Sequence, residues 1–206
     1  MCLDEDGIDV IPLNGPPMYK TTNLEMLDAL FEKKPDGYTP LCTKYREVID
    51  TYKSCDMKPL LIIVATDGIP TSFNNGKWYQ DVNSFVDLMK NRPDPKNTPT
   101  VLVKCCDDSV LEWMDDLDKD GFNIDVVDVF ENEKSQILIV QGNNFPFTIG
   151  DYVVKILLGS VDNLYDNLDE NKMTPLQLRE YVGNIINDNS NHSPEKPKND
   201  ECCVVL

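Results

Sequence analysis

The residues best suited to chemistry lie in the motif Thr66-Asp67-Gly68, which directly follows a continuous apolar run at 60–65. A run of that length is typical of a parallel strand buried on both faces. Ligands bind at the carboxyl ends of such strands, and a carboxylate there can coordinate a hard cation such as Mg²⁺. The same residues also fit an ordinary Asp-Gly turn, so both interpretations of Asp67 stay open.

The residue counts limit which other chemistry the chain can perform. His192 is the only histidine, which excludes a two-histidine metal site and disfavours a Ser-His or Cys-His catalytic centre. The seven cysteines form no Cys-x-x-Cys pair, so we expect neither a zinc ribbon nor a disulfide framework. We therefore predict that the chain is not an enzyme. An enzyme that uses acidic residues alone is the alternative.

Two motifs begin like known ligand-binding loops and then depart from them. The run Asp116-x-Asp118-x-Asp120-Gly121 begins like an EF-hand loop, but Val127 stands where the bidentate Glu belongs. An acidic turn that leads into a strand is the simpler interpretation. Gly76-Lys77 lacks the first glycine and the Ser/Thr of a phosphate-binding loop, which argues against a GTPase.

The last residues of the sequence suggest attachment to a membrane. Cys203-Val204-Val205-Leu206 fits a prenylation box, and Leu at its last position favours geranylgeranyl transfer. A single lipid chain binds a membrane only marginally, so we expect Cys202 to carry a second lipid. A chance tetrapeptide is the alternative. Since residues 1–6 lack the pattern of a signal peptide and no apolar run could span a bilayer, we expect the anchor on the cytoplasmic face.

The net charge of −17 narrows the class of partner. A surface this acidic repels phosphate backbones, which argues against nucleic acid. It also cannot attach the chain to an anionic lipid leaflet, so the attachment would depend on lipids. A basic protein partner fits the charge better than an acidic one.

Alternating strand and helix patterns predict a three-layer α/β fold with a mostly parallel, doubly wound sheet. We expect strands at 7–14, 60–65, 100–106 and 124–129, and helices at 22–33, 39–54, 80–91, 109–118, 149–160 and 175–186. The domain boundaries that follow are a domain at 1–170, a C-terminal helix at 171–187 and a disordered tail at 188–206 that carries the lipidation motif.

Several of these segments resemble von Willebrand factor A domains of the cytoplasmic fungal and protist type. The run Leu61–Pro70 resembles the fourth strand of that family, and Pro35–Leu41 resembles the loop that supplies its metal-site threonine. Residues 6–10 resemble its second strand, and the resemblance extends to about residue 170. It implies a Rossmann-like binding module in which Thr39 and Asp67 correspond to ligands of a Mg²⁺ site.

One part of the family pattern is missing from the sequence. The Asp-x-Ser-x-Ser motif that ends the first strand of the family occurs nowhere, so the first strand and first helix are expected to be missing. Thr39 and Asp67 alone make a weak, incomplete Mg²⁺ site, because that ion demands octahedral oxygen ligands. The strands near Ile8 and Leu61 then either pair directly or leave an open groove. Another chain could also supply the missing strand.

The function expected from this pattern is non-catalytic protein–protein binding by a module of the von Willebrand A type, tethered to the cytoplasmic face of a membrane through Cys203 and Cys202. The expected binding residues are Asp36, Tyr38 and Trp78, and no cofactor is required. A degenerate or truncated fragment of a metal-dependent adhesion-type domain is the alternative.

Overall fold

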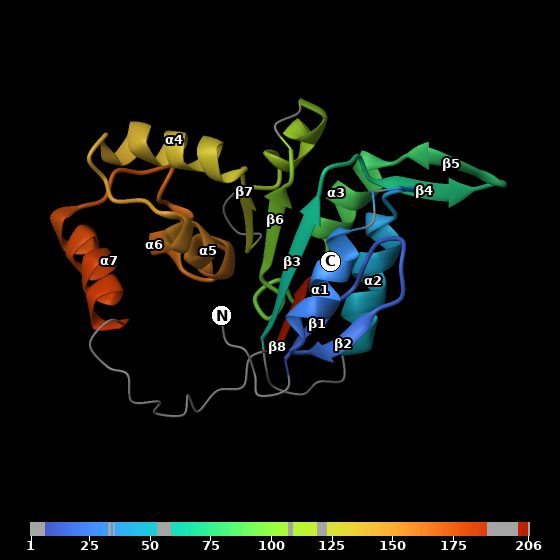
Figure 1. The fold of residues 1–206 in the computed structure, drawn as a ribbon. Helices are drawn as coiled ribbons and strands as arrows, with labels where there is room; N and C mark the ends of the chain where they lie inside the picture. Colours follow the sequence, from blue (N-terminus) through green and yellow to red (C-terminus); the bar gives the residue numbers. More distant parts are fainter. Residues whose placement is uncertain are drawn as a thin grey trace.

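The computed structural model describes residues 7–32, 34, 36–52, 59–106, 109–118, 123–188 and 202–205. Figure 1 shows a mixed α/β architecture in which a sheet runs through the middle of the molecule and helices flank it on both sides. Parallel strands flanked by helices are compatible with a Rossmann-like fold, as the alternating pattern predicts.

The main sheet has six strands in the order β2-β1-β8-β3-β6-β7. Four neighbouring pairs are parallel, and only β1 and β2 are antiparallel. The strands are β1 (Ile8–Val10), β2 (Met18–Thr21), β3 (Leu60–Thr66), β6 (Thr100–Lys104), β7 (Ile124–Val127) and β8 (Cys202–Val205). The strands expected from the apolar runs at 60–65 and 100–106 are confirmed, and β7 lies at the sheet edge.

The position between β1 and β3 is filled by β8, the last element in the sequence. Asp9 and Val10 of β1 stand opposite Val204 and Val205, and Leu60–Ile63 of β3 stand opposite Cys202–Val205. The strands near Ile8 and Leu61 therefore neither pair directly nor leave a gap. For residues 202–205 this differs from the predicted disordered tail, while 189–201 and 206 lie outside the described residues.

Four helices of the described residues lie on one side of the sheet, and all of them except α1 (Leu24–Phe31) contribute side chains to an apolar core. The other three are α2 (Leu41–Tyr52), α3 (Val82–Lys90) and the 3₁₀ helix η1 (Ser109–Met114). Tyr45 of α2 and Phe85 of α3 are completely buried against Ile62 and Leu102 of the sheet. The helix predicted at 109–118 is thus a shorter 3₁₀ turn followed by irregular chain.

The helices on the other side are α4 (Phe130–Gln141), α5 (Ile149–Leu158), α6 (Asn163–Asp166) and α7 (Pro175–Asp188). They form a second cluster around Ile137, Phe147 and Tyr181. The sequence analysis predicts no helix at 130–141, because α4 buries only Glu133 and Ile137 and shows almost no apolar periodicity.

A two-stranded hairpin, β4 (Thr71–Asn74) and β5 (Lys77–Gln80), projects from the main body (Figure 1). Asn75 and Gly76 at its tip both have positive φ, 49° and 77°. That combination is typical of an Asn-Gly turn in a tight hairpin. The Asn-Gly pair is the signal from which the sequence could have predicted it.

Candidate binding site at the carboxyl ends of the strands

Loops from distant parts of the sequence meet beyond the carboxyl ends of β1 and β3. The Asn14 side chain, which follows β1, donates a hydrogen bond to the carbonyl of Tyr38 (2.6 Å). The amide of Thr39 donates to the hydroxyl of Thr71 (2.9 Å), and the amide of Thr71 donates back to the carbonyl of Thr39 (2.8 Å). The segment that carries Tyr38 and Thr39 is thereby fixed between β1 and the hairpin.

Thr39 also lies against the loop that carries Asp67. A Cβ placed on Gly68 would be only 2.8 Å from the hydroxyl oxygen of Thr39, so glycine is what allows this approach. The Cys106 thiol contacts the carbonyl of Asp67 from the neighbouring strand end (3.7 Å). Thr39 is half-buried and Asp67 is exposed. The two loops that the family resemblance brings together are therefore neighbours, while a metal at this position remains a prediction.

Three exposed aromatic side chains form a continuous surface beside these loops, which we call the aromatic face (Tyr38, Phe73 and Trp78). Tyr38 and Trp78 stack with ring centroids 4.3 Å apart and an interplanar angle of 12°. Phe73 stands opposite Trp78 in the hairpin, with centroids 5.3 Å apart. Their exposed fractions are 49%, 60% and 36% for Tyr38, Phe73 and Trp78.

Carboxylates lie around the aromatic face. Asp36, two residues before Tyr38, and Asp67, in the loop next to Thr39, are both exposed. Asp81 lies at the base of the hairpin, and hydrogen bonds from the Ser72 and Ser84 side chains hold its pKa below the usual range. A lowered pKa favours the ionised form of Asp81, and the surroundings of the aromatic face are acidic.

The surroundings of Cys105, at the end of β6, disfavour its thiolate form. Burial raises the pKa of the Cys105 thiol, and nearby Asp67 and Cys106 raise it further. A thiolate is the nucleophilic form of cysteine, and a raised pKa makes it scarce.

A second polar cluster, absent from the sequence analysis, lies beneath the helices on the other side of the sheet. Lys155 of α5 is completely buried. Its ammonium lies 2.9 Å from Asp169, 3.3 Å from Glu133 and 3.6 Å from Asp125. We call these four residues the lysine cluster. A single lysine in the apolar run at 149–160 is the signal that could have revealed it.

The lysine cluster holds three carboxyl groups around a single ammonium group. Asp118, Asp125 and Asp166 each place a carboxylate oxygen within 4.8 Å of the others beside it. Burial, followed by the charges of Asp166 and Glu170, raises the pKa of Asp118 to about 7. Burial likewise raises the pKa of Asp125, and one oxygen of Asp125 accepts no hydrogen bond. Asp118, Asp125 and Asp166 could hold a cation or a shared proton, and Lys155 already supplies one positive charge.

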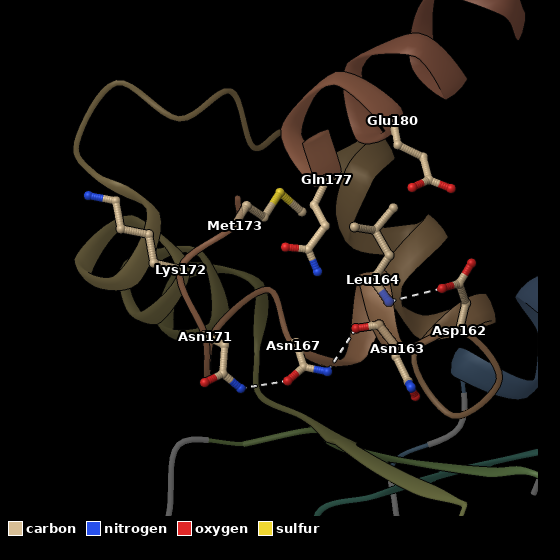
Figure 2. Close-up of a pocket in the computed structure, with 9 residues that line it drawn as sticks. All are labelled: Asp162, Asn163, Leu164, Asn167, Asn171, Lys172, Met173, Gln177 and Glu180. Atoms are coloured by element: carbon tan, nitrogen blue, oxygen red, sulfur yellow. Dashed lines mark hydrogen bonds between the residues drawn. The ribbon is translucent and has the colours of Figure 1, made fainter. Parts of the chain in front are cut away.

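A cavity of about 360 Å³ lies between α6 and the start of α7, and Figure 2 shows the residues that line it. Leu164, Met173 and Gln177 line its inside, and Asp162, Lys172 and Glu180 lie around it. The Asn171 side chain donates a hydrogen bond to the side chain of Asn167 (2.6 Å). The cavity lacks a buried polar group that would fix the orientation of a small molecule.

Comparisons with protein-family models, curated proteins and solved structures found no match. Within the described residues, no helix combines the length and apolar character that crossing a bilayer requires.

Proposed function

We propose that this chain is a non-catalytic protein-binding module of the von Willebrand A type that binds a basic segment of a partner protein. The observation that carries the proposal is the aromatic face, where Tyr38, Phe73 and Trp78 stack on one another and remain exposed. The parallel sheet flanked by helices, with Thr39 and Asp67 on adjacent loops, supports the family assignment.

The aromatic face has the composition of an energetic centre for binding. Tryptophan and tyrosine are enriched among the interface residues that lose most affinity when truncated. Stacking of Tyr38 on Trp78 fixes both rings before a partner arrives, which lowers the entropic cost of ordering them. The hydrogen bond from Asn14 to the Tyr38 backbone restrains the same segment.

The charge distribution selects a cationic partner. An arginine or lysine over Trp78 or Tyr38 would gain roughly 0.5–2 kcal/mol from cation–π attraction, depending on how far the contact is desolvated. Asp36 and Asp67 can pair with further basic side chains, and the net charge of −17 accelerates association with a basic protein.

Binding is direct in this proposal, with metal in at most an accessory role. Thr39 and Asp67 would provide two of the six oxygens that Mg²⁺ requires, and water or the partner would have to provide the others. The partner therefore gains most of its affinity from the aromatic face and the surrounding carboxylates.

The proposal includes a lipid anchor at Cys203, with Cys202 as the second lipid site, on the cytoplasmic face of a membrane. The prenylation box supports it. In cells, wild type should partition to membranes and Cys203→Ser should not. Equal soluble fractions of the two proteins would refute the anchor.

Fluorescence anisotropy with a labelled arginine-rich peptide, compared with a glutamate-rich peptide of equal length, tests the binding surface. We expect only the basic peptide to bind, and Trp78→Ala to weaken binding about tenfold or more. Tyr19→Ala is the matched control, because Tyr19 is an exposed aromatic on β2. Equal affinities of Trp78→Ala and Tyr19→Ala would show that the peptide binds by charge alone and would overturn the proposal.

A further inference from the structure

The segment Cys202–Val205 has two incompatible uses. In the structure it is an interior strand, β8, with parallel neighbours on both sides. In the proposed lipid anchor, the same segment must enter the active site of a transferase as an extended peptide. A backbone that is paired on both sides cannot do so. A folded β8 therefore withholds Cys203 from lipid transfer.

The position between β1 and β3, which we call the groove, favours an apolar strand such as residues 202–205. Without β8, the main sheet divides into the pair β2–β1 and the three strands β3–β6–β7. A two-stranded pair is marginal by itself, and two open apolar edges invite association. Interior parallel strands are apolar and rich in β-branched residues, which Val204 and Val205 supply. The same two aliphatic residues complete the prenylation box.

Release of β8 leaves the pairing of β3 with β6 intact. The amides of Leu60 and Ile62 donate toward β6, to the carbonyls of Asn97 (2.8 Å) and Pro99 (3.0 Å). Since donors alternate along a strand, the amides of Leu61 and Ile63 face β8. Leaving the groove therefore breaks the β8 ladders and preserves the pairing of β3 with β6.

We propose that the groove between β1 and β3 is a binding site for residues 202–205, and that filling it shields Cys203 from lipid transfer. The inference rests on the lipid anchor of the proposed function. In the released state, the Cys203 sulfur bonds to C1 of geranylgeranyl diphosphate, the C–O bond to diphosphate breaks, and the thiol proton passes to solvent. The lipid then keeps the strand out of the groove.

Alkylation of Cys202 and Cys203 by N-ethylmaleimide, followed by mass spectrometry of the full-length protein, tests the groove without lipid. Val205→Pro removes an amide donor from β8, and Val205→Ile is the matched control that keeps a β-branched side chain. We expect alkylation about tenfold or more slower in wild type and Val205→Ile than in Val205→Pro. Equal rates in all three proteins would overturn the inference.

Transfer of geranylgeranyl from its diphosphate by a protein geranylgeranyltransferase separates the two proposals. Leu61→Pro leaves residues 202–206 unchanged but removes a donor that faces β8, so we expect faster transfer to it than to wild type. Equal transfer to both would overturn the shielding and keep the anchor. If neither protein accepts the lipid, although Val205→Pro still exposes the thiols to N-ethylmaleimide, both the anchor and the shielding from lipid transfer are refuted. Circular dichroism shows whether Leu61→Pro folds. If it does not fold, the alkylation rates of wild type, Val205→Ile and Val205→Pro test the shielding.

Discussion

The two sides of the sheet are stabilised by different interactions, apolar packing on one side and a buried ion cluster on the other. On the side of α2 and α3, apolar residues are completely buried, and several of the polar groups among them are hydrogen-bonded. Tyr45 shares a 2.8 Å hydrogen bond with Thr100, and Arg92 donates to the carbonyl of Met89 (2.7 Å). On the side of α4 and α5, one buried ammonium lies among carboxylates, some of whose oxygens have no hydrogen-bond partner.

This difference determines how each side responds to change. Apolar burial depends on area and packing, and it is insensitive to pH. A buried ion cluster depends on protonation and on each partner, because a charge left alone in the interior is costly. Substitutions on the charged side should therefore have larger effects than matched substitutions at the surface, and only the charged side should respond to pH.

The largest effect is expected from Lys155→Met. It leaves the carboxylates of Asp125, Glu133 and Asp169 without their common cation, and the free energy of unfolding should fall by about 3–5 kcal/mol. Lys44→Met removes a lysine whose pair with Glu47 is exposed, and should cost less than about 1 kcal/mol. Urea denaturation measures both. Similar values for the two variants would contradict a structural role for the lysine cluster.

Gly159→Ala tests how rigidly the lysine cluster is packed. Gly159 has helical φ and ψ of −53° and −49°, but its Cβ would be 1.6 Å from a carboxylate oxygen of Asp125. We expect a loss of about 1–3 kcal/mol from overpacking. Gly150→Ala, in the same helix, is the control, since its Cβ would meet only the Thr148 hydroxyl at 3.5 Å. A thermal melt in which both variants match wild type would show that the Asp125 carboxylate moves freely.

The pH dependence of stability should come from the charged side. Burial and the charges of Asp166, Glu170 and Asp169 raise the pKa of Asp118 to about 7, while Lys155 opposes the shift. In the unfolded chain this pKa is about 4. The folded state therefore binds the proton more tightly, so stability from this group is highest below about pH 4 and is lost as the pH rises to about 7.

Between about pH 8 and pH 5.5, wild type should gain about 1 kcal/mol more stability than Asp118→Asn, after allowance for partial exposure of the carboxylate. Leu102→Ala, in the apolar core, should lower stability at both pH values but keep the wild-type pH dependence. Urea denaturation at the two pH values measures the slopes. Identical slopes for wild type and Asp118→Asn would assign the pH dependence to other groups.

The smallest effect is expected from Mg²⁺. Because Thr39 and Asp67 would supply only two ligands, Mg²⁺ at about 1 mM should raise stability by less than about 0.4 kcal/mol, the gain when the ion concentration equals Kd. Micromolar affinity in titration calorimetry that is lost in Asp67→Ala would contradict this. If micromolar affinity is lost in Asp118→Asn and kept in Asp67→Ala, the ion binds among Asp118, Asp125 and Asp166.

Much of the sheet could be predicted because its signals are local. The apolar run at 60–65 specifies a buried strand, and the motif that follows specifies which loop carries Asp67. The aromatic face was predicted only in part. Tyr38 and Trp78 were expected at a partner-binding surface, but their stacking and the contribution of Phe73 depend on a hairpin that the sequence analysis did not include.

The sequence by itself determined the local elements and the residues that end them, because apolar periodicity and turn chemistry act over a few neighbours. Only the tertiary structure decided the strand between β1 and β3 and the partners of Lys155. The groove is filled by residues about 140 positions away from Leu61, and Lys155 joins Asp125, Glu133 and Asp169 from three other segments. Such pairings depend on which edges and charges remain unsatisfied after the local elements have formed, and no short sequence window records that.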